Sequence, residues 1–128
     1  MVHALKDAYD PVYPPDPRTW LDLDEGERLD LVSEYHESTG EEIPSIPAHA
    51  AIHVIVENQL AERIFPVEAA LQRLLAEGLD RHDALHAVAS VLAEHLHNIM
   101  KGHLPGADPN EPYYRALEKL SAETWGAD

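Results

Sequence analysis

Prolines and glycines divide this chain into segments, and within each segment apolar residues recur at intervals of three and four. That spacing puts apolar side chains on one face of an α-helix, whereas a half-buried strand would need strict alternation. We therefore predict an all-α fold, with about five helices packed as a small bundle. The predicted helices cover residues 24–38, 47–63, 66–78, 80–100 and 113–124.

The first 20 residues do not fit this helical pattern. They contain four prolines and three large aromatic residues, namely Pro11, Pro14, Pro15, Pro17, Tyr9, Tyr13 and Trp20. Proline lacks a backbone N–H and biases the residue before it toward extended conformations. We predict an extended arm over residues 1–20 that docks through its aromatic residues, followed by a helical body over residues 21–128. The whole length of 128 residues suits a single domain.

Charge and composition narrow the classes of partner. Asp and Glu number 24 against 9 Lys and Arg, a net charge of -15, which opposes binding to nucleic acid or to an anionic membrane surface. No apolar run has the length of a membrane span, and no signal-peptide pattern opens the chain. The sequence has no cysteine, so thiolate sites and disulfides are excluded. We expect a cytoplasmic protein that forms a homodimer or binds a partner protein.

Histidine is the compositional anomaly, with nine in the chain. Two predicted helices each open with His-x-x-x-His, and a glutamate follows on or near the same face. The six residues of these two rows are His49, His53 and Glu57, then His82, His86 and Glu94.

Neutral imidazole and carboxylate groups are natural ligands for zinc, iron, manganese or nickel, and helical bundles build such sites from side chains on neighbouring helices. We predict that the two rows form one divalent transition-metal site, with the glutamates as ligands or as residues that orient the ligands. Whether His36 or His97 joins the site is left open by the sequence. The alternative is a buried polar network in which glutamates satisfy the imidazoles.

Known metal-site patterns fit only in part. The metalloprotease pattern needs Glu directly after the first His, which neither row has. A di-iron carboxylate bundle needs two Glu-x-x-His motifs, and only Glu94-x-x-His97 is present. A phosphohydrolase of the His–Asp type is a minor alternative, with His82-Asp83 flanked by His53 and Asp108.

The segments HAAIHVIVENQLA and RHDALHAVASVLAEHL resemble an uncharacterised bacterial family, domain of unknown function 1841. The shared pattern is His-x-x-x-His-x-x-x-Glu-x-Gln, a spacer, then His-x-x-x-His and a later Glu, over about residues 47–98. The resemblance implies helices and a shared polar cluster, and it brings no known activity.

Two functional hypotheses follow from these patterns. In the first, the protein is a metal-binding protein, and an open coordination position would make it a metal-dependent hydrolase. In the second, it is a non-enzymatic interaction or regulatory module in which the His/Glu cluster is structural or senses pH.

Overall fold

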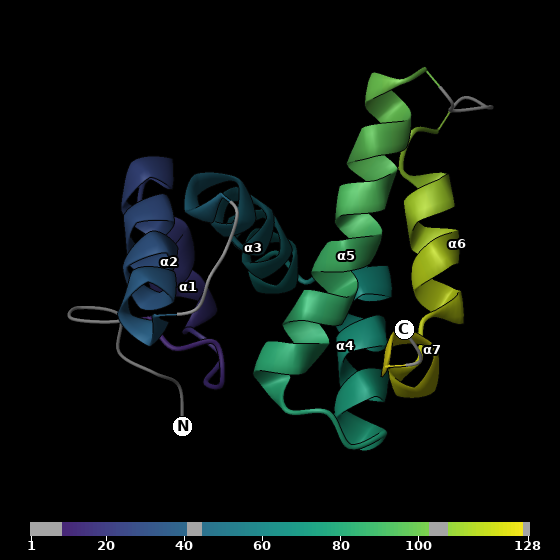
Figure 1. Ribbon diagram of the computed structural model, residues 1–128, viewed down its shortest axis with the longest axis horizontal. Helices are drawn as coiled ribbons and strands as arrows, with labels where there is room; N and C mark the ends of the chain where they lie inside the picture. Colours follow the sequence, from purple (N-terminus) through teal and green to yellow (C-terminus); the bar gives the residue numbers. More distant parts are fainter. Residues whose placement is uncertain (1–8, 41–44, 103–107, 127–128) are drawn as a thin grey trace. The chain divides into compact units, whose positions relative to one another are not determined.

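The computed structural model describes residues 9–40, 45–102 and 108–126, and its regular elements in these ranges are helices (Figure 1). Seven helices are present there, so the predicted all-α class is confirmed, with two short helices beyond the five predicted. They are α1 (Pro17–Asp22), α2 (Glu25–Thr39), α3 (Ile46–Ala61), α4 (Phe65–Ala76), α5 (Arg81–Met100), α6 (Glu111–Lys119) and α7 (Ala122–Gly126). His3 and His103 lie outside the described residues.

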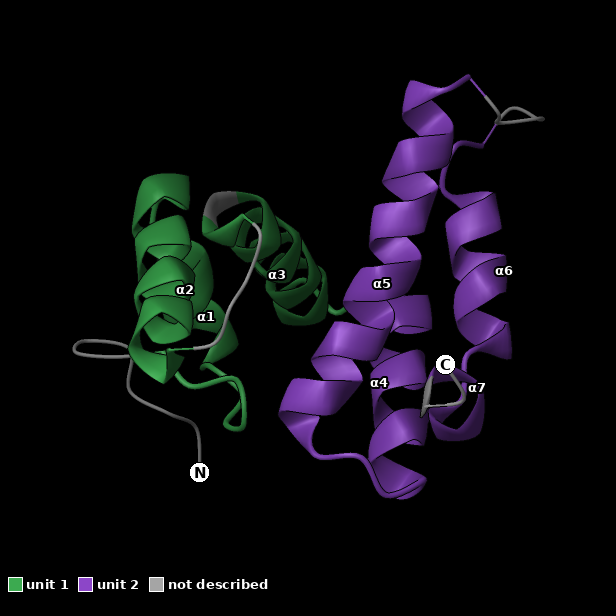
Figure 2. Ribbon diagram, in the orientation of Figure 1, with its two compact units in different colours: residues 1–64 green, residues 65–128 purple. Residues whose placement is uncertain are grey.

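The helices form two compact units, residues 1–64 with α1 to α3 and residues 65–128 with α4 to α7 (Figure 2). Each unit is considered by itself below. The single domain expected from chain length stays a prediction.

The first unit is organised by local capping signals and a small apolar core. Asp24 and Glu27 form a reciprocal capping box at the start of α2, and Gly40 ends that helix in the left-handed region. Ser45 accepts a hydrogen bond from the backbone N–H of Ala48 and caps α3. The buried apolar core of the unit comprises Tyr9, Trp20, Val32, Ala50 and Val54.

The predicted extended arm ends earlier than expected, because residues 17–22 form α1. Asp16 caps this helix, and Pro17 fits its first turn, where no N–H is needed. The backbone N–H of Thr19, with its hydroxyl, donates to the Asp16 carboxylate and lowers the pKa of that group. Trp20 is fully buried, as predicted, but it docks from a helix.

Arg28 ties the three helices of this unit together. Its guanidinium donates to the carbonyl oxygens of Trp20 (3.0 Å), Leu21 (2.9 Å) and Leu23 (2.8 Å) at the end of α1. A further N–H donates to Oδ1 of Asn58 on α3 at 3.0 Å, and the Trp20 indole donates to the same oxygen at 2.8 Å. One side chain on α2 therefore caps α1 and contacts α3.

The second unit is built on the packing of α5 against α4, α6 and α7. Gly78 follows α4 at φ 107°, where it donates to Leu75, while Leu79 donates to Leu74. This bonding pattern is a Schellman motif, and it confirms Gly78 as the predicted stop. The buried apolar residues of α4 and α5 include Val67, Leu71, Leu74, Leu85, Val88 and Leu92.

The last predicted helix, residues 113–124, is wrong as a single element, because the chain breaks at Leu120 between α6 and α7. Arg73 of α4 donates to the carbonyl oxygens of Leu117 (2.6 Å) and Leu120 (2.7 Å), which satisfies the end of α6. Glu77 accepts from the N–H of Ala122 at 2.8 Å at the start of α7. Arg73 and Glu77 thus stabilise this break from a distance, and Ser121 and Thr124 support it locally through reciprocal hydrogen bonds at the start of α7.

Among the described helices, none combines the length and apolar character needed to cross a bilayer.

We predict that Arg28→Ala lowers the free energy of unfolding by about 2 kcal/mol, because it leaves carbonyl groups of α1 and Asn58 without their charged donor. Arg28→Lys should lose most of the same stability, since an ammonium group cannot reproduce the planar fork. Urea unfolding followed by circular dichroism measures both.

The matched control is Arg115→Ala, which removes an exposed ion pair with Glu111 on α6. Its effect should stay below about 0.5 kcal/mol. Equal losses for Arg28→Ala and Arg115→Ala would show that the Arg28 bonds do not hold the first unit together.

Candidate metal centre

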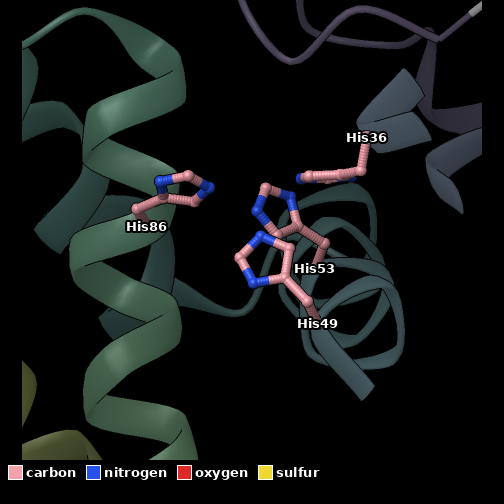
Figure 3. A group of neighbouring side chains, drawn as sticks. All are labelled: His36, His49, His53 and His86. Atoms are coloured by element: carbon pink, nitrogen blue, oxygen red, sulfur yellow. The ribbon is translucent and has the colours of Figure 1, made fainter. Parts of the chain in front are cut away.

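Three histidines of the first unit point toward one another from α2 and α3. His36 lies in the last turns of α2, and His49 and His53 lie one turn apart in the first half of α3. Figure 3 shows these three imidazoles, together with His86 of α5. His36 and His53 are buried, with 2% and 1% of their surfaces exposed, and His49 is half-buried.

Apolar neighbours explain why these polar rings lie inside the protein. Val32 is one turn before His36 on α2, and both are buried. Ala50 and Val54 directly follow His49 and His53, and both belong to the apolar core. The packing of α2 against α3 therefore carries the three histidines inward with the core residues beside them.

The rings are close enough to share an ion. The ring centroid of His36 lies 4.5 Å from that of His49 and 4.8 Å from that of His53. The centroids of His49 and His53 are 4.8 Å apart. Each ring offers a nitrogen, and these nitrogens lie within 4.8 Å of one another. In a tetrahedral zinc site with bonds of about 2.1 Å, ligand nitrogens are about 3.4 Å apart. Small rotations of the side chains would close that difference.

The orientation of His36 is set by a backbone group. Its Nδ1 lies 2.8 Å from the carbonyl oxygen of Val32. A carbonyl only accepts, so Nδ1 carries the proton, and Nε2 carries the lone pair that a metal would use. This carbonyl contact to the second ring nitrogen is the arrangement that commonly orients metal-binding histidines.

Glu57 does not lie with the histidine nitrogens, although the sequence predicted it in the same row. Its side chain is buried, with 1% exposed, and its carboxylate accepts a hydrogen bond from the hydroxyl of Tyr9. Of the two roles predicted for Glu57, orientation therefore fits the structure better than direct ligation.

The second predicted row lies on α5 in the other unit. His82 and His86 are half-buried, with ring centroids 4.3 Å apart. Glu94 and His97 are exposed on the same helix, and Glu94 lies about 12 Å along the axis from His86, too far for one ion held by α5 alone. The assignment of His82 and His86 to a site shared with α3 stays a prediction.

The His–Asp alternative loses support within the second unit. Asp83 is exposed in the first turn of α5, where its N–H is capped by Asp80. Asp108 follows the opposite end of that helix, whose length from Asp83 onward is about 25 Å. The two carboxylates therefore do not meet around His82.

His95 is buried, whereas its position away from the His82 face of the helix predicted an exposed side chain. It is 6% exposed on α5, and its ring stacks on Tyr113 of α6 at a centroid distance of 5.4 Å and an interplanar angle of 20°. Its Nε2 is buried and has no hydrogen-bond partner in the described part of the chain. The sequence signal for the burial of His95 was its position among apolar residues, between Leu92 and Leu96.

No protein-family model, curated protein or solved structure matches this chain. The resemblance to domain of unknown function 1841 therefore stays a prediction.

We predict that His95→Leu raises the free energy of unfolding by about 1 kcal/mol, because a buried nitrogen with no hydrogen-bond partner costs stability that an apolar side chain of similar size does not. Thermal and urea unfolding measure the change. His97→Leu, on an exposed position of the same helix, should change stability by less than about 0.5 kcal/mol. A destabilised His95→Leu variant would contradict the prediction and assign a structural interaction to that ring.

Proposed function

We propose that this protein binds a divalent transition metal through His36, His49 and His53. The observation that supports the proposal best is the meeting of three imidazole nitrogens, within 4.8 Å of one another, from two different helices. A metal requires such a convergence of nitrogens, whereas core packing alone does not.

The donor set narrows the choice of metal. Three neutral nitrogen donors suit zinc, iron and nickel, whereas magnesium and calcium prefer oxygen. Manganese also prefers oxygen ligands. Of zinc, iron, manganese and nickel, it is therefore the metal that a centre without a carboxylate ligand fits least well. Zinc is our first choice, because three histidines and one further position form a common zinc coordination.

The chemistry of such a metal centre depends on what fills the fourth coordination position of the ion. If water occupies it, a bound zinc ion would lower the pKa of that water and supply a hydroxide nucleophile near neutral pH, which is the basis of metal-assisted hydrolysis. We propose hydrolysis as the reaction class. A non-catalytic metal site that stabilises the fold is the competing function, and it would use the position for a fourth protein ligand.

The metal itself is tested on chain purified without a histidine tag after metal-supplemented growth. We expect elemental analysis to find about one equivalent of metal per chain, and His53→Ala to weaken zinc affinity by more than about 100-fold. Zinc should raise the melting temperature of the wild type, and a chelator should remove that increase.

The matched control is His97→Ala, which removes an exposed imidazole and should leave zinc affinity unchanged. The polar-network alternative gives another pattern, in which His53→Ala loses the same stability with or without chelator. Less than about a tenth of an equivalent of any transition metal in the wild type would overturn the proposal.

The sequence prediction that α5 contributes ligands is part of the proposal and has its own test. If a histidine of α5 fills the fourth position, His82→Ala or His86→Ala should weaken zinc affinity by at least about tenfold, as loss of a ligand or of its support does. Isothermal titration calorimetry of both variants measures this. If both variants bind zinc with wild-type affinity, the metal centre is restricted to the first unit. Water is then favoured in the fourth coordination position.

A further inference from the structure

Tyr9 is buried although it precedes the first helix of the chain. Only 3% of it is exposed, and its ring lies 5.8 Å from the ring of Trp20 on α1 and 6.2 Å from that of Tyr35 on α2. Its hydroxyl donates to the carboxylate of Glu57 on α3. One side chain thus contacts all three helices of the unit.

Two of these contacts are next to the proposed metal ligands. Tyr35 directly precedes His36, and the two rings lie 5.2 Å apart. Glu57 lies one turn after His53 on the same face of α3, about 6 Å along the axis. Tyr9 therefore contacts Tyr35, which is next to a proposed ligand on α2, and Glu57, which is one turn from a proposed ligand on α3.

A buried carboxylate also has an electrostatic effect on a nearby cation. Burial removes the hydration of Glu57, and a hydrogen bond from a hydroxyl replaces part of it. An ionised Glu57 would favour a divalent ion held by His53 one turn away, because charges interact more strongly where water is excluded.

We propose that Tyr9 and Glu57 are positioning residues for the metal centre, so that the docking of the segment before α1 and the binding of the metal strengthen each other. This inference rests on the proposed function. Tyr9 fixes the Glu57 carboxylate and the spacing of α2 and α3, and both favour the bound ion. Linkage then requires that the ion in turn strengthens the docking of Tyr9.

The test uses the full chain with Co²⁺ and Zn²⁺ as probes. Cobalt absorption reports the geometry of the ligands, and competition with zinc gives the affinity. We expect Tyr9→Phe and Glu57→Gln each to lower the affinity on the order of tenfold, and the double variant to lower it by less than the product of the two. Tyr13→Phe, in the same segment but 52% exposed, is the matched control and should bind as wild type.

A second measurement needs no variant. In wild-type chain labelled at the tyrosine ring carbon that bears the hydroxyl, zinc should shift the Tyr9 resonance and leave that of Tyr13 unchanged. A purely structural role for Tyr9 would lower the stability of the Tyr9→Phe variant but would not produce this zinc-dependent shift.

The outcomes separate the two proposals. If wild-type chain binds neither cobalt nor zinc, the proposed function fails and this inference fails with it. If wild-type chain binds zinc, while both variants keep its affinity and the Tyr9 resonance does not move, only the positioning role is overturned. Should Glu57→Gln fail to fold, Tyr9→Phe, which keeps the ring, and the wild-type resonance still decide.

Discussion

The packing of α2 against α3 is the interaction on which the first unit depends. Val32 on α2 and Ala50 and Val54 on α3 form its core, and the histidines occupy positions beside or one turn from these residues. Burying the apolar side chains therefore also brings the imidazoles together, at no separate cost in chain entropy. A substitution that alters the spacing of these two helices would disturb the core and the histidine cluster together.

Polar side chains add direction to this apolar packing. Arg28 and Asn58 link α1, α2 and α3 through hydrogen bonds, and Tyr9 links the same helices through its ring and its hydroxyl. Hydrophobic burial alone tolerates sliding of one helix along another, whereas these bonds are directional and fix the register. The proposed metal centre, whose nitrogens would converge on one ion, needs such a fixed register.

Local signals in the sequence were sufficient to predict most of the helices. Residues that start or end a helix, such as Asp24, Gly40 and Gly78, act within a few residues of that helix. The sequence pattern also identified His49 and His53. The remaining features depend on partners distant in the chain. The break after α6 is stabilised by Arg73, 47 residues away, and the role of Glu57 depends on Tyr9, 48 residues away. His36 lies alone on its helix, so only the packing of α2 could reveal that it joins the cluster.

The hydrogen bond between His36 and the carbonyl of Val32 makes the three proposed ligands unequal. His36 is buried and held in one orientation, so its rotamer freedom was lost on folding and is not lost again when an ion binds. His49 is half-buried at the start of α3 and keeps contact with solvent. An incoming ion would exchange its hydration water first at His49 and only then reach the buried rings of His36 and His53. The rate of metal exchange would then be governed by His49, and the geometry of the final complex by His36.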